Sequence, residues 1–194
     1  MELKGKTIGF ALTGSFCTYE KISAEIEKIV KLGASIVPIM SEISLEMVSR
    51  FGAGSEIAAK LEELTGNEVI STIKDAEPIG PRGFLDILVV APCTGNTIAK
   101  LSNAITDGAV TMAVKAHTRN NKPLLLGISS NDGLSANAKN IGTLLARKNV
   151  FFVPFGQDDP KNKCNSLVFK SELLVPSIEE ALEFRQIQPM LKGN

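Results

Sequence analysis

The amino-acid sequence predicts an α/β protein, a three-layer αβα sandwich in which helices cover both faces of a parallel sheet. Two observations lead to this prediction. Short apolar runs alternate with longer segments whose apolar residues recur at helical spacing, which is typical of strand–helix–strand units. The run at 84–92 is apolar almost throughout, as expected of a parallel strand covered on both faces. The length of 194 residues suits a single domain, 1–194, with a sizeable core.

The first part of the chain contains two clear strands, each followed by a helical pattern. Ile22, Ile26 and Ile29 recur on one helical face, and Gly33 and Gly66 are typical helix ends. The expected elements, in order, are a strand at 7–13, a helix at 19–33, a strand at 34–40, a short helix or ordered loop at 41–52, a helix at 55–66 and a weaker strand at 68–73.

The rest of the chain continues the alternation and completes a Rossmann-like parallel sheet of five or six strands. The C-terminal helix is expected at about 177–187, because Ser177 is a favourable N-cap and acidic residues follow it. The expected elements are a loop rich in Pro and Gly at 75–83, a strand at 84–92, one or two helices at 96–120 with a division near Asp107-Gly108, a strand at 122–130, a helix at 134–149, a strand at 150–155, a polar loop at 157–165 and the C-terminal helix.

Composition and charge exclude several classes of function. The 21 basic and 21 acidic residues balance, so we expect no nucleic-acid partner. The longest apolar run contains Asp86 and is too short to span a bilayer, so we expect no membrane partner. No cleavage pattern of a signal peptide follows the first apolar segment, and a cytoplasmic protein is therefore expected.

The cysteine and histidine residues form no metal or disulfide pattern. Cys17, Cys93 and Cys164 are widely spaced, and the single histidine, His117, has no cluster of carboxylates beside it. We expect Cys93 to be a small buried residue. His117 lies among polar and charged residues, and we expect it at the surface.

Four strands are followed by glycine or small polar residues, which predicts a polar cleft. These strand ends are at 13–15, 40–41, 92–97 and 127–131. In open α/β sheets, ligands bind outside the carboxyl ends of the strands, where the strand order reverses. In the first turn, Gly14 allows close backbone approach, and Ser15 and Thr18 offer hydroxyls before a helix N-terminus, which favours a phosphate. A plain turn is the alternative, because neither a GxGxxG nor a Walker A pattern occurs.

The segment APCTGNTIAKLSNAITDG resembles the signature of the flavoprotein family that includes flavin-dependent cysteine decarboxylases and prenyl-flavin synthases. Cys93 and Gly95 stand where that family usually has Ala. The matching residues are Pro92, Thr94, Asn96, Thr97, Ile98, Ala99, Lys100, Leu101 and Asp107.

The resemblance implies an FMN site at the predicted cleft. Gly14, Ser15 and Thr18 would hold the phosphate. Ser41, Thr94, Asn96 and Thr97 would line the ring or the ribityl chain, and Ser129, Ser130 and Asn131 would close the cleft. Hydroxyl and amide groups suit the polar edge of a flavin. From the residues alone, Asn96 could also be the N-cap of a helix that starts near Thr97.

The sequence departs from the decarboxylases of this family at two motifs. They have a histidine shortly before the central strand and a Pro-x-Met-Asn-x-x-Met-Trp-like motif after the next strand. Here 75–81 contains no histidine, and ISSNDGLSANA contains neither Met nor Trp. His117 does not match the catalytic position, so decarboxylation is disfavoured and we assign no catalytic residue.

Longer runs, including GKTIGFALTGSFCTYEK and CNSLVFKSELLVPSIEEAL, resemble one branch of the family, in which the chain is the B subunit of an oxidoreductase. The branch implies oxidation of dihydrodipicolinate to dipicolinate in the mother cell of a sporulating bacterium. A separate A subunit would carry the nicotinamide nucleotide, and family members form homo-oligomers. The alternatives are a non-catalytic nucleotide-binding, phosphate-binding or scaffolding subunit, and an FMN-dependent decarboxylase.

Two cations are candidates for binding the small-molecule substrate. The guanidinium group of Arg82 suits a dicarboxylate. Lys100 lies one helical turn beyond Asn96 and could face the same ligand. Either side chain could instead be solvated.

Overall fold

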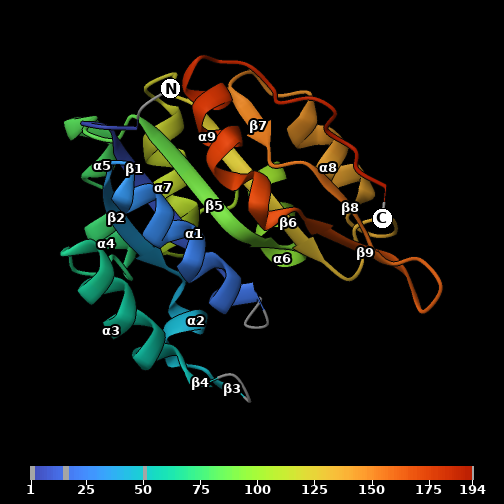
Figure 1. Cartoon of the computed structure of the whole chain (residues 1–194), viewed down its shortest axis with the longest axis horizontal. Coiled ribbons are helices and arrows are strands. Elements are labelled where there is room, and N and C mark those ends of the chain that lie inside the picture. Colours follow the sequence, from blue (N-terminus) through green and yellow to red (C-terminus); the bar gives the residue numbers. More distant parts are fainter. Residues whose placement is uncertain (1–2, 15–17, 50–51, 194) are drawn as a thin grey trace.

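The computed structural model describes residues 3–14, 18–49 and 52–193, which form a central sheet with helices on both sides (Figure 1). Within these residues the sheet has seven strands in the order β2-β1-β5-β6-β9-β8, and β7 also pairs with β6. The strands are β1 (Thr7–Leu12), β2 (Ser35–Met40), β5 (Ile87–Thr94), β6 (Leu124–Ser130), β7 (Val150–Phe152), β8 (Phe155–Asp159) and β9 (Lys163–Phe169). The chain passes from β1 to β2 and then returns to place β5 on the other side of β1. The strand order therefore reverses between β1 and β5.

Strands β1 and β5 form the buried centre of the sheet. They pair in parallel from Ile8 with Ile87 to Ala11 with Val90, and β2 pairs in parallel with the other side of β1. The β5 residues from Ile87 to Cys93 are all buried. Because β5 is covered on both faces, its sequence is apolar at successive positions instead of alternating.

Helices cover both faces of the sheet, which confirms the predicted three-layer fold. On one face, α1 (Tyr19–Lys31) packs against α9 (Leu174–Leu182) and the preceding 3-10 turn (Ser171–Leu173). On the other face lie α6 (Gly95–Ser102), α7 (Ala109–Thr118) and α8 (Ala138–Leu145). The expected division of the long helical pattern near Asp107-Gly108 is confirmed, since α6 ends before it and α7 begins after it.

A smaller group of elements extends from the β2 edge. It contains α2 (Glu42–Glu46), β3 (Val48–Ser49), β4 (Gly52–Ala53) and α3 (Gly54–Thr65), which lie at the bottom of the view in Figure 1. The short helices α4 (Ile73–Ala76) and α5 (Ile79–Arg82) pack against α7. Because α2 follows β2 directly, it stands beside the carboxyl ends of the central strands.

Two expectations for 68–83 are wrong. The strand at 68–73 is reduced to one bridge between Ile70 and Ile39, and Thr72 instead caps α4 by accepting a hydrogen bond from the N–H of Asp75 at 3.1 Å. The loop at 75–83 contains helical turns. Pro78 is the N-cap of α5 and the left-handed Gly83 is its C-cap, so these Pro and Gly residues begin and end a short helix.

Two expectations for the C-terminal part are also wrong. Strands β8 and β9 form an antiparallel hairpin where we expect a polar loop from the sequence. Strand β9 pairs with β6 at Ser129 and Ser130 only, and the outer part of the hairpin is polar and exposed. The sheet is therefore mixed. The last helix begins at Leu174, and Ser177 lies inside it, where its buried hydroxyl donates to the carbonyl oxygen of Leu173 at 2.6 Å.

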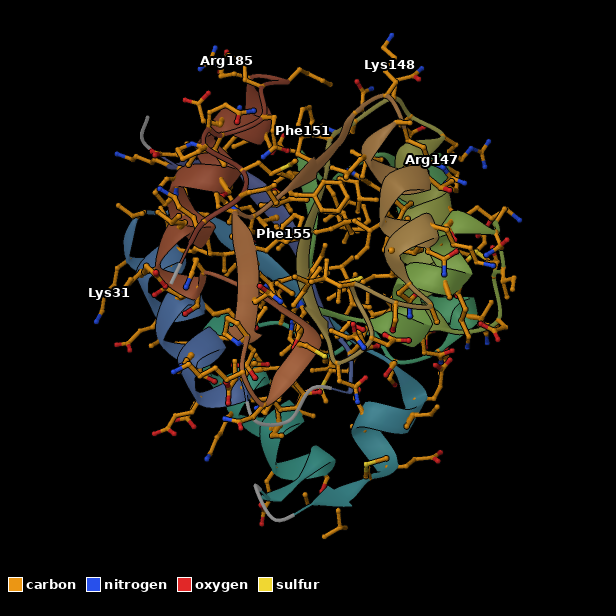
Figure 2. All side chains as sticks on the ribbon, turned by 90° about the vertical axis from the view of Figure 1, so that its right-hand side faces the viewer. Lys31, Arg147, Lys148, Phe151, Phe155 and Arg185 are labelled. Atoms are coloured by element: carbon orange, nitrogen blue, oxygen red, sulfur yellow. The ribbon has the colours of Figure 1, made fainter. Side chains whose placement is uncertain are left out.

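The side chains separate clearly into interior and surface. Figure 2 shows Phe151 and Phe155 in the middle of the molecule, where both are buried, whereas Lys31, Arg147 and Arg185 lie at its periphery. Among the described residues, no helix is both long enough and apolar enough to cross a bilayer.

Candidate functional site

A cavity of about 560 Å³ lies at the carboxyl edge of the sheet, where the strand order reverses. Its volume falls in the range of small-molecule and cofactor sites. Hydroxyl, amide, charged and apolar side chains all contribute to it. The described lining residues are Thr13, Gly14, Ser41, Glu42, Ile43, Met47, Thr94, Asn96, Thr97, Lys100, Asp107, Gly108, Val110 and Thr111.

The floor of the cavity is built where β1 and β5 end. Thr13 Oγ1 donates to the carbonyl oxygen of Pro92 at 2.8 Å and accepts from the N–H of Thr94 at 3.1 Å. Thr94 and Thr97 hydroxyls lie 3.1 Å apart. The buried Tyr19 hydroxyl donates to the carbonyl oxygen of Thr13 at 2.9 Å, and burial raises the pKa of Tyr19. The hydroxyls of Thr13, Thr94 and Thr97 therefore lie in one row of contacts on the floor, and Tyr19 anchors the backbone of Thr13.

The wall of the cavity comes from α2 and α7. Ser41 caps α2 by accepting from the N–H of Ser44 at 3.2 Å. The next residue, Glu42, reaches across to α7, where its Oε1 accepts from the N–H of Ala109 at 3.0 Å. A carboxylate at a helix N-terminus is favourable, so this contact ties α2 to α7.

The remaining side is closed by the turn between α6 and α7. Lys100 Nζ lies 2.9 Å from Asp107 Oδ2. Thr111 Oγ1 accepts from the N–H groups of Asp107 and Gly108, each at 3.1 Å. The end of the turn, at Asp107 and Gly108, is therefore tied both to α6 and to α7, and Lys100 remains partly exposed beside the cavity.

The donor set fits a flavin. The cavity offers the hydroxyls of Ser41, Thr94 and Thr97 and the exposed amide of Asn96, with apolar contacts from Ile43 and Met47. A heteroaromatic ring needs such a mixture, because its edge carries donors and acceptors and its faces are apolar. Gly14 adds a strand end at which the backbone can approach a phosphate.

The structure brings many of the predicted site residues together, but not all of them. Gly14, Ser41, Thr94, Asn96, Thr97 and Lys100 line the cavity. Thr18 instead lines a separate cavity of about 240 Å³ with residues of α1 and β9. Ser15 falls outside the described residues. The β6 end with Ser129, Ser130 and Asn131 is not part of the described cavity wall.

Arg82 lies far from the cavity. It ends α5, just before β5 begins, whereas the cavity stands at the carboxyl end of the eight-residue β5. A strand of this length spans roughly 25 Å. Within this chain, Arg82 therefore does not reach a ligand bound in the cavity that Lys100 lines.

Asn96 and His117 also differ from expectation. The N-cap of α6 is Thr94, and Asn96 lies exposed in the first turn, so the capping role for Asn96 is wrong. His117 is 1% exposed, and its Nε2–H donates to the carbonyl oxygen of Pro123 at 2.9 Å. Burial lowers the pKa of His117 to about 4. Helix α7 packs against the sheet and α4, which buries a residue whose sequence neighbours are polar. Cys93 is fully buried, as expected.

Sequence reasoning missed a carboxylate behind the N-terminus of α6. Asp132 accepts hydrogen bonds from Ser130 Oγ and from Asn137 Nδ2, the latter at 2.9 and 2.8 Å, and these bonds lower the pKa of Asp132. A Cβ on Gly95 would lie 2.7 Å from Asp132 Oδ1, so glycine is required for this close packing. The composition of 129–137 predicts a turn, but it carries no signal for which side chain faces α6.

Comparisons with known proteins place this architecture in a family. The chain is 52% identical to the B subunit of dipicolinate synthase from Bacillus subtilis over 99% of its own length and 96% of that protein. A crystal structure of the B subunit of dipicolinate synthase from Bacillus halodurans has a TM-score of 0.92 and 44% identity, with both chains fully covered. The FMN-dependent cysteine decarboxylase SpaF shares the fold alone, with a TM-score of 0.68 and 18% identity over 93% of this chain and 97% of that one. The model of the Flavoprotein family matches residues 1–171, and so the chain, as its Asn-Thr segment predicts, belongs to the Flavoprotein family.

Proposed function

We propose that this chain is the B subunit of a dipicolinate synthase and that it binds FMN in the cavity at the carboxyl edge of the sheet. The observation that carries the proposal is a cavity of about 560 Å³ with hydroxyl and amide groups on its wall, in a chain 52% identical to the B subunit of a dipicolinate synthase. When bound, FMN would supply a hydride acceptor for oxidation of dihydrodipicolinate to an aromatic pyridine.

The side chains of the cavity suit distinct parts of the cofactor. Gly14 stands at the end where β1 leaves the sheet, and the phosphate would lie against the turn that begins there and continues with Ser15. Thr94, Asn96 and Thr97 would hydrogen-bond the ribityl chain or the ring, and Ser41 would contact the ring from the opposite wall.

Lys100 would bind a carboxylate of the substrate through an ion pair. It is the one cation among the described lining residues. Its partner Asp107 is half-exposed, so solvent screens this ion pair and the positive charge of Lys100 is only partly neutralised. Substrate binding, orientation and exclusion of water are the roles that these side chains support. Proton transfer has no candidate histidine on the described part of the wall.

The active assembly would contain an A subunit that carries a nicotinamide nucleotide, and several copies of this chain would form a homo-oligomer. It would act in the cytoplasm of the mother cell during sporulation. A scaffolding subunit without cofactor is the alternative, and it predicts an assembly that needs no flavin.

The test is to purify this chain alone and with the A subunit, to identify released ligand by mass spectrometry and to assay dihydrodipicolinate oxidation. We expect FMN to bind this chain, and T94V and N96A to weaken that binding while the fold is retained. If this chain binds no FMN and the assembly with the A subunit is equally active after flavin is removed, the scaffolding alternative is correct and the proposal is wrong.

A further inference from the structure

We propose that Glu42 determines which end of the ligand enters the α2–α7 side of the cavity, because its free carboxylate oxygen accepts a hydrogen bond from the imide N–H of the flavin ring. This inference rests on the proposed function and extends it to a specificity-determining residue.

The Glu42 carboxylate is held firmly in place. Its Oε1 accepts from the N–H of Ala109, the first residue of α7, at 3.0 Å. A Cβ on Gly108 would come within 2.8 Å of its Oε2, so the carboxylate lies directly on the backbone of this glycine. Because Gly108 leaves the space for this approach, Glu42 occupies the position at the start of α7 that an anion would otherwise take.

The second oxygen is available to a ligand. Glu42 lines the cavity, and among the residues that the structure describes, its Oε2 has no hydrogen-bonding partner. A carboxylate only accepts hydrogen bonds, so this oxygen requires an N–H or O–H group. It also repels a phosphate.

The charges on this side favour the same orientation. Asp107 directly precedes Gly108, against which Glu42 packs, and the charge of Asp107 is opposed by Lys100 at 2.9 Å. Glu42 has no cation within ion-pair distance among the described residues. The α2–α7 side therefore carries a net negative charge, which favours an N–H donor over a phosphate, and the phosphate is directed to the Gly14 end. In FMN, the group that meets this requirement at the end opposite the phosphate is the imide N–H of the ring.

The test compares FMN with FMN methylated at the imide nitrogen, by titration of wild type, E42Q and E46Q. In E42Q the amide oxygen still accepts from the N–H of Ala109, but its NH₂ group replaces the acceptor with a donor. Glu46 lies on the same helix, is exposed and does not line the cavity, so E46Q makes the same change of charge as a matched control. Thermal unfolding of each variant monitors the fold.

We expect methylation to weaken binding to wild type and to E46Q roughly tenfold or more, and E42Q to bind FMN about tenfold more weakly than wild type. E42Q should bind the two ligands with similar affinities, because the acceptor that distinguishes them is gone. If Glu42 has only a structural role, E42Q will bind both ligands more weakly by the same factor, and the ratio of the two affinities will equal that of wild type. This result would overturn the inference while FMN binding stands. If wild type binds no FMN, the proposed function fails and the inference fails with it.

Discussion

Thr13 and Thr94, which are 81 residues apart in sequence, are joined through one hydroxyl group. The Oγ1 of Thr13 accepts from the N–H of Thr94 at 3.1 Å and donates to the carbonyl oxygen of Pro92 at 2.8 Å. The bonds link the ends of β1 and β5 at the point where the strand order reverses. The same hydroxyl therefore supports the fold and shapes the floor of the cavity.

Replacing Thr13 with Val keeps the shape of the side chain and removes both hydrogen bonds. Because the bond to the carbonyl oxygen of Pro92 is buried, this oxygen loses its donor without gaining water, and we expect a loss of about 1–3 kcal/mol in the free energy of unfolding. Urea denaturation measures it. T13S retains the hydroxyl and should cost less, and equal losses in T13V and T13S would mean that packing of the methyl group matters more than the bonds.

Gly95 and Gly142 provide a matched pair of glycines in helices. A Cβ on Gly95 would meet Ser130, Asn137 and Asp132 within 2.6–2.7 Å, whereas a Cβ on Gly142 has nothing within 4 Å. We expect G95A to destabilise the protein by about 1–3 kcal/mol and G142A to stabilise it by roughly 0.5–1 kcal/mol. Thermal unfolding of the two variants checks this, and a neutral G95A would show that the Asp132 turn is free to move away.

The buried His117 should make stability depend on pH. Its pKa falls from 6.5 to about 4 on folding because burial disfavours the charged imidazolium. Between these two values the unfolded chain binds a proton that the folded chain does not, so stability decreases as the pH falls through this window. From pH 7 to pH 5 the contribution is about 2 kcal/mol.

The measurement is urea denaturation at pH 7 and pH 5 for wild type and H117Q. Gln can keep a donor for the carbonyl of Pro123 but does not titrate. H117Q should therefore be less stable than wild type at pH 7 and lose less on acidification. The same pH slope in both proteins would assign the effect to other groups.

Lys100 and Arg82 should differ in their effect on dicarboxylate binding. Lys100 lines the cavity and Arg82 stands at the opposite edge of the sheet. We expect K100Q to weaken binding of dipicolinate about tenfold and R82Q to leave it within about twofold, as measured by calorimetry. The reverse pattern would mean that Arg82 of another copy of the chain completes the site.

The layered fold could be predicted from the sequence because local patterns carry it. The apolar run of β5 requires cover on both faces, and the repeated isoleucines of α1 require one buried helical face. The β8–β9 hairpin could not be predicted, since its outer residues pair only with each other and need no apolar side chains. The burial of His117 could not be predicted, because its sequence neighbours are polar whereas its own position on α7 faces the interior.

The alternation of strands and helices, the polar strand ends and the family signature can all be identified in the sequence, because each is a property of neighbouring residues. Which polar groups converge depends on the folded chain. Glu42 contacts Ala109, which is 67 positions away in the sequence. Arg82 is much closer in sequence to the cavity residue Thr94, yet it lies at the opposite edge of the sheet from the cavity. The physical reason is that strand order and the path of the connections place side chains in space, and no local periodicity specifies either of them.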